Sequence, residues 1–257
     1  MIANISETLL FVVVMVDQRT TVVLAILFLL FHSTLEQLVS RTERVSLIQL
    51  RSSLGLRSRE WPIKEDPCLI WVGIQCENGR VVGINISGFK RTRIGSQNPQ
   101  FAVDALANFT LLASFNASRF LLPSSIPDWF GQQVVSLQVL DLRSCSITGA
   151  IPYTLGNLTN LTALYLSDNS LTGIIPSSLG QLVRLSVLDL SQNSLTGSFP
   201  SSFASLRNLT LLDMSANFLS GTIPPAIGTL SKLEFLNLSS NSLSSSIPGQ
   251  LGDLSSL

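Results

Sequence analysis

Three aspartates recur at one position of a repeated pattern, and their carboxylates are the first candidates for chemistry in this sequence. Asp141, Asp189 and Asp213 are separated by multiples of 24 residues, so a regular fold would place them in one column. Such a column could bind a cation or act as a general base. Each aspartate also lies between apolar residues in a Leu-Asp-Leu type of pattern. We therefore expect a structural position of the repeat and no metal site.

Other residues that could support catalysis are few. His32 is the only histidine, and the sequence contains no His-Glu-x-x-His motif, no phosphate-binding glycine loop and no kinase motif. The 16 basic and 16 acidic residues balance, which leaves no field to hold nucleic acid. The basic cluster Lys90, Arg91 and Arg93 is interpreted as a solvated loop rather than a ligand contact. We expect no enzyme activity and no cofactor.

A period of 24 residues runs through the second half of the chain and must position these side chains. The leucines at this spacing are Leu137, Leu161, Leu185, Leu209, Leu233 and Leu257. Within one unit, Leu164 and Leu166 alternate as in a strand with one buried face. A period of about 20 to 30 residues with this pattern predicts a leucine-rich-repeat solenoid, a right-handed superhelix. Its parallel strands would line a concave face, and its convex side would be irregular or 3-10 helical.

Polar and turn residues hold fixed positions in each unit. A side-chain amide just after the strand can donate to and accept from the backbone of adjoining coils, which predicts a ladder. The ladder residues are Cys145, Asn169, Asn193, Asn217 and Asn241. Four units carry a glycine four residues later, at a bend that a side chain would crowd, and the fifth carries Ser245. An Ile-Pro or Phe-Pro pair then ends the local pairing.

The unit resembles the plant-specific class of leucine-rich repeat, with the pattern L-x-x-L-x-L-x-x-N-x-L-x-G-x-I-P-x-x-L-G-x-L-x-x. We assign a first irregular coil to 81–111, a degenerate repeat to 112–136, full repeats to 137–160, 161–184, 185–208, 209–232 and 233–256, and the start of a truncated further repeat to 257. This division gives about seven coils.

Residues 41–80 resemble the helical N-terminal cap of the same plant family, which has paired cysteines and a tryptophan. The resemblance implies a disulfide between Cys68 and Cys76, in keeping with an oxidising compartment. The amphipathic run 46–56 is expected to form the cap helix. Cys145, the odd cysteine, is assigned a structural place in the ladder rather than a reactive role.

An export signal is expected upstream of the cap. Two apolar runs, 9–16 and 21–31, are separated by residues 17–19, which include two charges. A single membrane span would bury those charges at a cost of about 2.5 to 3.5 kcal/mol each. Residues 15–40 are therefore interpreted as a signal peptide, and residues 1–14 as a gene-model extension.

Secretion would make Asn-x-Ser/Thr sequons available for glycosylation. We expect glycans on at least two of the candidates Asn108, Asn116, Asn157, Asn160 and Asn208. Asn237 is left out because a glycan there would obstruct the concave surface.

The concave face is the predicted binding surface, because residues that flank buried strand leucines point outward. The residues selected as ligand contacts are Arg143, Tyr165, Asp189, Asp213 and Phe235. Further residues assigned to this surface are Gln138, Thr162, Ser186, Thr210 and Glu234. Seven coils at a strand spacing of about 4.8 Å make a sheet roughly 30 Å long, enough for about nine residues of an extended peptide.

Residues 15–257 resemble the extracellular region of plant leucine-rich-repeat receptor-like protein kinases. The resemblance implies cell-surface signalling through an extracellular peptide or protein ligand, with a co-receptor as a second partner. It also implies a missing C-terminal segment with a membrane span and a kinase domain, which would attach the protein to the plasma membrane with these repeats on the extracellular side. Without that segment, it would be secreted or held in the cell wall. The alternatives are a secreted protein resembling polygalacturonase inhibitors and a structural or co-receptor repeat protein.

Overall fold

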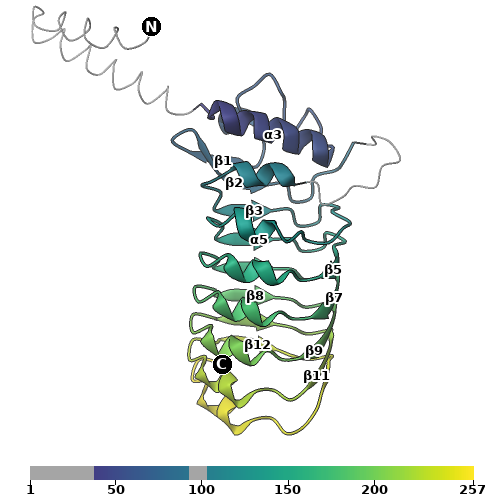
Figure 1. The fold of residues 1–257 in the computed structure, drawn as a ribbon, viewed down its shortest axis with the longest axis vertical. Coiled ribbons are helices and arrows are strands. Elements are labelled where there is room, and N and C mark those ends of the chain that lie inside the picture. The colour runs from purple at the N-terminus through teal and green to yellow at the C-terminus, as the bar shows by residue number, and fades with distance from the viewer. Residues whose placement is uncertain (1–37, 93–102) are drawn as a thin grey trace, which may run out of the picture.

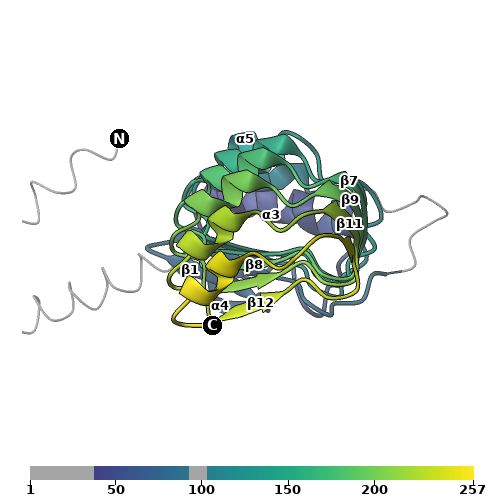
Figure 2. The ribbon, with the colours of Figure 1, turned by 90° about the horizontal axis from the view of Figure 1, so that it is seen from below.

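The computed structural model describes residues 38–92 and 103–257, which form a stack of coils with a helix covering one end (Figure 1). The expected gene-model extension and residues 15–37 of the expected signal peptide lie outside the described residues. Within 38–92 and 103–257, no helix has the length and apolarity needed to cross a bilayer. Seen along the stack, each coil has a strand side and a helical side (Figure 2), and the buried apolar residues fill the space between them.

The concave sheet has eight strands in the order β1-β2-β3-β4-β6-β8-β10-β12. Only β1 pairs in antiparallel fashion among the described strands, and each later strand pairs in parallel with the next coil. The bounds are β1 Ile74–Glu77, β2 Arg80–Asn85, β3 Ser114–Asn116, β4 Val139–Asp141, β6 Ala163–Tyr165, β8 Val187–Asp189, β10 Leu211–Asp213 and β12 Phe235–Asn237. In the three-residue strands the middle residue packs inward, as Leu164 and Leu188 do. The predicted solenoid is therefore confirmed.

A second parallel sheet runs beside the first, and the sequence analysis did not predict it. Its order is β13-β11-β9-β7-β5, with bounds β5 Thr148–Ala150, β7 Ser170–Ile174, β9 Ser194–Ser198, β11 Phe218–Gly221 and β13 Ser242–Leu243. The repeated glycines lie in this sheet with φ of 77° to 81°. They are needed because other residues rarely adopt this conformation. The expectation of a crowded bend is wrong for Gly173, where an added Cβ would meet only an ordinary contact at 3.7 Å.

Short helices return each coil along the convex side. Their bounds are η2 Asp104–Asn108, α5 Phe130–Gln133, η3 Tyr153–Asn157, η4 Ser177–Gln181, η5 Ser201–Ser205, η6 Pro225–Thr229 and η7 Gly249–Asp253. The glycine of the Leu-Gly-x-Leu segment allows neighbouring coils to approach. At Gly180 an added Cβ would lie 2.6 Å from the carbonyl oxygen of Ser202 in the next coil. This glycine therefore serves close packing between coils.

The cap helix α3 spans Arg41–Leu54 and covers the open end of the first coils. Ser40 caps its N-terminus by accepting from the N–H of Glu43, and Gly55 ends it with a left-handed φ of 63°. The expected range of 46–56 begins five residues too late. Glu43 is polar yet fully covered, because its carboxylate accepts from the Nε of Arg80 at 2.9 Å and from the N–H of Val81 at 2.8 Å.

Residues immediately before α3 also belong to the cap. The N–H of Val39 donates to the carboxylate of Asp66, and the N–H of Ser40 donates to the carbonyl of Gly79. Both residues fall inside the range 15–40 that was assigned to the signal peptide. The structure thus places the last two residues of that range in the folded cap.

A short helix and a disulfide complete the cap. Helix α4 (Pro67–Ile70) carries Cys68, which is bonded to Cys76 on β1 as expected. Trp61 and Trp71 stack with their ring centroids 5.0 Å apart and are buried. Each indole N–H donates to a backbone carbonyl, so neither buried ring leaves a polar group unpaired.

The asparagine ladder joins consecutive coils. The side-chain amide of Asn193 donates to the carbonyls of Leu166, Leu190 and Ser191, and its oxygen accepts from the N–H of Leu171 at 3.0 Å. Asn169, Asn217 and Asn241 make corresponding bonds to their own and preceding coils. The side chains therefore satisfy backbone groups that the two sheets leave unpaired.

Cys145 occupies the same position of the ladder, but fewer backbone groups there need a side-chain hydrogen bond. Its thiol donates to the carbonyl of Ala117 at 3.0 Å, which corresponds to one bond of the ladder amide. The N–H groups of Phe120 and Leu122 in the preceding coil already donate to backbone carbonyls. A side-chain acceptor is therefore unnecessary at 145, so a cysteine can stand at the first position of the ladder.

We predict that Gly180→Ala lowers stability by about 1–3 kcal/mol, because the new methyl group overpacks two coils. Gly252→Ala is the matched control, since no atom lies within 4 Å of the Cβ added there. Urea midpoints of the two variants and the parent chain would measure the effect. Equal midpoints for the two variants would refute close packing at Gly180.

Candidate functional site

The concave sheet exposes three parallel columns of side chains, one from each outward position of the coil. The first column is apolar and in register from strand to strand: Val139, Ala163, Val187, Leu211 and Phe235. Phe235 is the most open of these, with 45% of its surface exposed. This column can receive the apolar side chains of an extended ligand.

Sequence reasoning found only the last residue of the apolar column. It assigned Thr162, Ser186 and Thr210 to the surface, and these residues are partly exposed, each directly before a residue of the apolar column. Their hydroxyls donate to carbonyls of the preceding coil at 2.9 to 3.0 Å and so help the coils to stack. Strict alternation outward from the buried Leu140 would have given Val139 and its equivalents.

The second column holds the aspartates. In register it contains Asn85, Asn116, Asp141, Tyr165, Asp189, Asp213 and Asn237. Asp189 accepts from the hydroxyl of Ser167 at 2.6 Å and from both the N–H and the hydroxyl of Ser191. Asp213 likewise accepts from Ser215 and from the amide of Asn237. These carboxylates are held by local donors, which agrees with a structural role for the column.

Tyr165 interrupts the second column, and Arg143 interrupts the third. The third column otherwise consists of serines: Ser87, Ser118, Ser167, Ser191, Ser215 and Ser239. Arg143 donates from Nε at 3.0 Å and from a terminal nitrogen at 2.6 Å to the two carboxylate oxygens of Asp141. Its guanidinium also lies 4.6 Å from the ring centroid of Tyr165. The exceptional residues of the two columns thus form one cluster.

Contacts within this cluster change the exposure of Asp141 and the pKa and orientation of Arg143. Asp141 points outward as expected, yet it is only 3% exposed because Arg143 covers it. The hydrogen bond to Asp141 raises the pKa of the Arg143 guanidinium. The two-point contact and the aromatic ring fix the orientation of Arg143 before any ligand arrives.

The selected contact residues do not form a single site. Arg143 and Tyr165 meet on adjacent coils, whereas Phe235 is three strands away from Tyr165, or about 14 Å at ordinary strand spacing. Asp189 and Asp213 lie between them. The surface is therefore an extended track that is suited to a ligand contacting several coils.

Part of the basic cluster is not a solvated loop. The Arg91 guanidinium lies 5.0 Å from the ring centroid of the fully buried Phe120. Burial lowers the pKa of Arg91. The interpretation as a solvated loop is wrong for this residue, while Lys90 is exposed and Arg93 lies outside the described residues.

The sequons differ in their surroundings. Asn108, Asn157 and Asn208 are exposed and lie on the helical side of the coils or next to it. Asn160 and Asn208, which occupy the same repeat position, each donate from the side-chain nitrogen to a carbonyl of the preceding coil, that of Val135 and that of Val183. Asn116 lies on β3 in the same column as Asp141, where a glycan would cover the concave face. The argument used to leave out Asn237 therefore applies to Asn116 as well.

The described residues carry no cluster of three or more His, Cys, Asp or Glu side chains that could hold a metal ion.

Residues 123–257 match the family model described as a leucine-rich repeat region. The chain belongs to the leucine-rich-repeat family. The match covers the coils that carry the ladder and most of the concave columns.

The leucine-rich-repeat chain is similar to plant receptor kinases. It is 59% identical over 153 residues to a probable receptor-like serine/threonine-protein kinase of Arabidopsis thaliana, covering 57% of this chain and 17% of the relative. The chain therefore spans less than a fifth of the length of that curated relative.

Two solved structures have the same leucine-rich-repeat architecture. One is the ectodomain of the Arabidopsis thaliana receptor kinase GASSHO1/SCHENGEN3 in complex with CASPARIAN STRIP INTEGRITY FACTOR 2, with a TM-score of 0.63, 33% identity, and coverage of 82% of this chain and 28% of that one. The other is the ectodomain of the Arabidopsis receptor kinase HAESA in complex with a peptide hormone, with a TM-score of 0.53, 27% identity, and coverage of 84% and 44%.

We predict that the Cys145 thiol resists alkylation in the folded protein. Burial raises its pKa to about 12, so the reactive thiolate is scarce at pH 8, and the side chain is fully covered. Iodoacetamide at pH 8 should leave the native chain unmodified and label one thiol in denaturant, as intact mass would show. Rapid labelling of the native protein would contradict a structural role.

Proposed function

We propose that this chain is the ligand-binding part of the extracellular domain of a receptor-like protein kinase that acts in cell-surface signalling. The concave sheet would bind an extended extracellular peptide or a segment of a protein, and a co-receptor would be a second partner. The repeat region itself is not catalytic. In the whole protein, a serine/threonine kinase domain across the membrane would transmit the signal.

The observation that carries this proposal is the uninterrupted concave track. Seven strands from β2 to β12 pair in parallel, and on the five strands from β4 to β12 their outward residues include an apolar column beside polar and charged ones. The six steps between them extend over about 29 Å, the length of eight or nine residues of extended peptide. Tyr165 and Phe235 lie on this track, and aromatic residues are frequent in binding hot spots.

The similar proteins support the same assignment. The relative at 59% identity is a probable receptor-like kinase, and both similar ectodomains were solved with a bound factor or hormone. The disulfide Cys68–Cys76 suits an oxidising compartment. We therefore place the repeats in the secretory pathway and then outside the plasma membrane, with attachment through a segment beyond this chain.

We predict that peptides selected for binding to this chain bind to its concave face. A phage-displayed library of random ten-residue peptides would be panned on the folded chain, and enriched peptides would be measured on variants. Val187→Arg should weaken the binding of these peptides by roughly tenfold or more, because a charge would disrupt the apolar column. The matched control is Val183→Arg, at a valine that is 51% exposed outside the concave strands.

Equal affinities for the two arginine variants would place the peptides elsewhere and contradict the proposed binding face. Loss of binding in the Val187 variant alone supports it. Circular dichroism of both variants would show whether either substitution alters the fold.

We also predict that the plant-expressed protein carries glycans at Asn157 and Asn208, because both are exposed at the edges of coils. Peptide-N-glycosidase should increase its gel mobility. Removal of both sequons by Asn157→Gln and Asn208→Gln should reduce that shift, whereas an unchanged mobility in the parent protein would count against secretion through the glycosylating pathway.

A further inference from the structure

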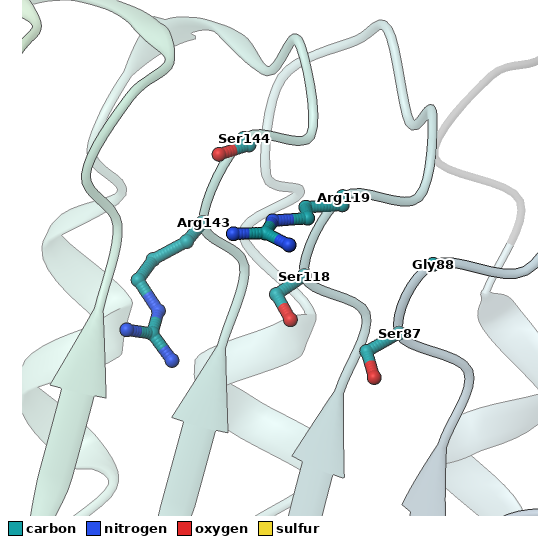
Figure 3. A pocket seen from close by; sticks show the side chains of 6 residues that line it. All are labelled: Ser87, Gly88, Ser118, Arg119, Arg143 and Ser144. Carbon is teal, nitrogen blue, oxygen red and sulfur yellow. The ribbon is translucent and has the colours of Figure 1, made fainter.

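A hollow of about 320 Å³ lies where strands β2, β3 and β4 end, at one edge of the concave sheet. Its lining residues are Ser87, Gly88, Ser118, Arg119, Arg143 and Ser144, two consecutive residues from each of three coils (Figure 3). Among these lining residues, which are all described, none is acidic and none is apolar. The hollow therefore presents hydroxyl and guanidinium groups together.

The donors in this hollow are mostly uncommitted. In other coils, the serine of the third column donates its hydroxyl to a carboxylate or amide oxygen, as Ser191 and Ser215 do. Within the described part of the chain, the hydroxyls of Ser87 and Ser118 donate to no such oxygen. Arg143 uses two of its five N–H groups on Asp141, which leaves three for another acceptor.

Arg119 supplies the unbalanced charge. The ion pairs in the described residues are Arg44 with Asp66, Arg80 with Glu43, and Arg143 with Asp141, so Arg119 takes part in none of them. Asp141 neutralises Arg143, so Asp141 and the lining residues together carry one net positive charge, while a further carboxylate, that of Asp168, accepts from the Ser144 hydroxyl at 2.7 Å. In Figure 3 the Arg119 side chain extends toward the coil of Arg143 and Ser144.

The backbone gives no reason for an arginine at this place. Arg119 has a left-handed φ of 59°, a conformation that non-glycine residues adopt at a cost. The equivalent residues of other coils share this conformation and are Gly88, Ser144, Asp168, Gln192, Ala216 and Ser240. Arg119 is the only cation among them, and its side chain extends toward the neighbouring coil, which carries Arg143, the only cation of the three columns.

From this geometry we infer that the hollow is a subsite for one carboxylate of the bound ligand, supplied by an acidic side chain. A carboxylate matches the net charge of Asp141 and the lining residues, and its two oxygens can accept from the fork of Arg119, with the hydroxyls of Ser87 and Ser118 and the free edge of Arg143 beside it. Asp141 and Tyr165 hold Arg143 in place beforehand, which reduces the entropy lost on binding. This inference rests on the proposed function and adds a ligand feature to it.

The direct test is NMR of arginine Nε–H groups in the full chain, titrated with N-acetyl-aspartate amide at constant ionic strength. The signals of Arg119 and Arg143 should shift saturably, and those of Arg184, an exposed arginine on another part of the coils, should not. The neutral isostere N-acetyl-asparagine amide is the ligand control. Inorganic sulfate and phosphate test the alternative that the hollow prefers a tetrahedral anion.

Arg119→Gln should weaken the binding of N-acetyl-aspartate amide by roughly tenfold or more, since a charge-assisted hydrogen-bonded pair is lost. This variant is conservative for the fold, because Gln192 already occupies the same left-handed position three coils on. Arg184→Gln is the matched control and should bind as the parent does. Unmoved signals, equal shifts with the asparagine amide, or preference for phosphate or sulfate would overturn the carboxylate subsite.

The peptides selected for the concave face separate this inference from the proposed function. Peptides whose binding is weakened by Val187→Arg should contain an acidic residue, and Arg119→Gln should weaken their binding as well. If they bind the Arg119 variant unchanged, the subsite is refuted while the concave face remains the ligand surface. If Val187→Arg has no effect, the proposed function fails whatever Arg119 does.

Discussion

The structure depends on how each coil satisfies backbone groups between its two sheets. A coil leaves the concave sheet after three residues and enters the second sheet a few residues later, and corner groups such as the Leu171 N–H and the Leu166 carbonyl are bonded by the Asn193 side chain. Asn193 and its equivalents supply three donor contacts and one acceptor contact there, and Asn193 itself is buried. Unpaired backbone groups in such a place cost free energy, so the ladder fixes both the period of 24 residues and the register between coils.

Function follows from this register. Because consecutive strands pair without a shift, each outward position becomes a straight column, and one exceptional residue stands out against its neighbours. Arg143 and Tyr165 are such exceptions, and they meet only because β4 and β6 are adjacent. The aspartates show the opposite case, since Asp189 and Asp213 are held by serines of the same coil or of a neighbour and contribute regularity rather than chemistry. A repeat architecture thus separates the residues that build the coil from those free to bind.

Much of the fold was predictable because its determinants are local and repeated. Leu164, Asn169 and the Ile-Pro pairs give strand, corner and turn within one unit. The second sheet was missed because Gly173 and its equivalents weaken the sequence pattern of a strand, and pairing with the next coil provides the compensation. The start of α3 was missed because Glu43 is buried by Arg80, a residue 37 positions away. The Arg119 hollow depends on three coils at once, and side-chain direction across coils does not follow from the period alone.

The most direct test of this account is residue-resolved hydrogen exchange of the chain with Asn193→Ala. The Leu171 N–H donates to Asn193, and the Leu219 N–H donates to Asn241, which gives an internal reference two coils on. The account predicts that the variant exchanges its Leu171 amide about tenfold faster or more while Leu219 keeps its protection, because a buried donor loses its acceptor. Unchanged protection of Leu171 would mean that strand pairing and apolar packing hold the coils without the ladder.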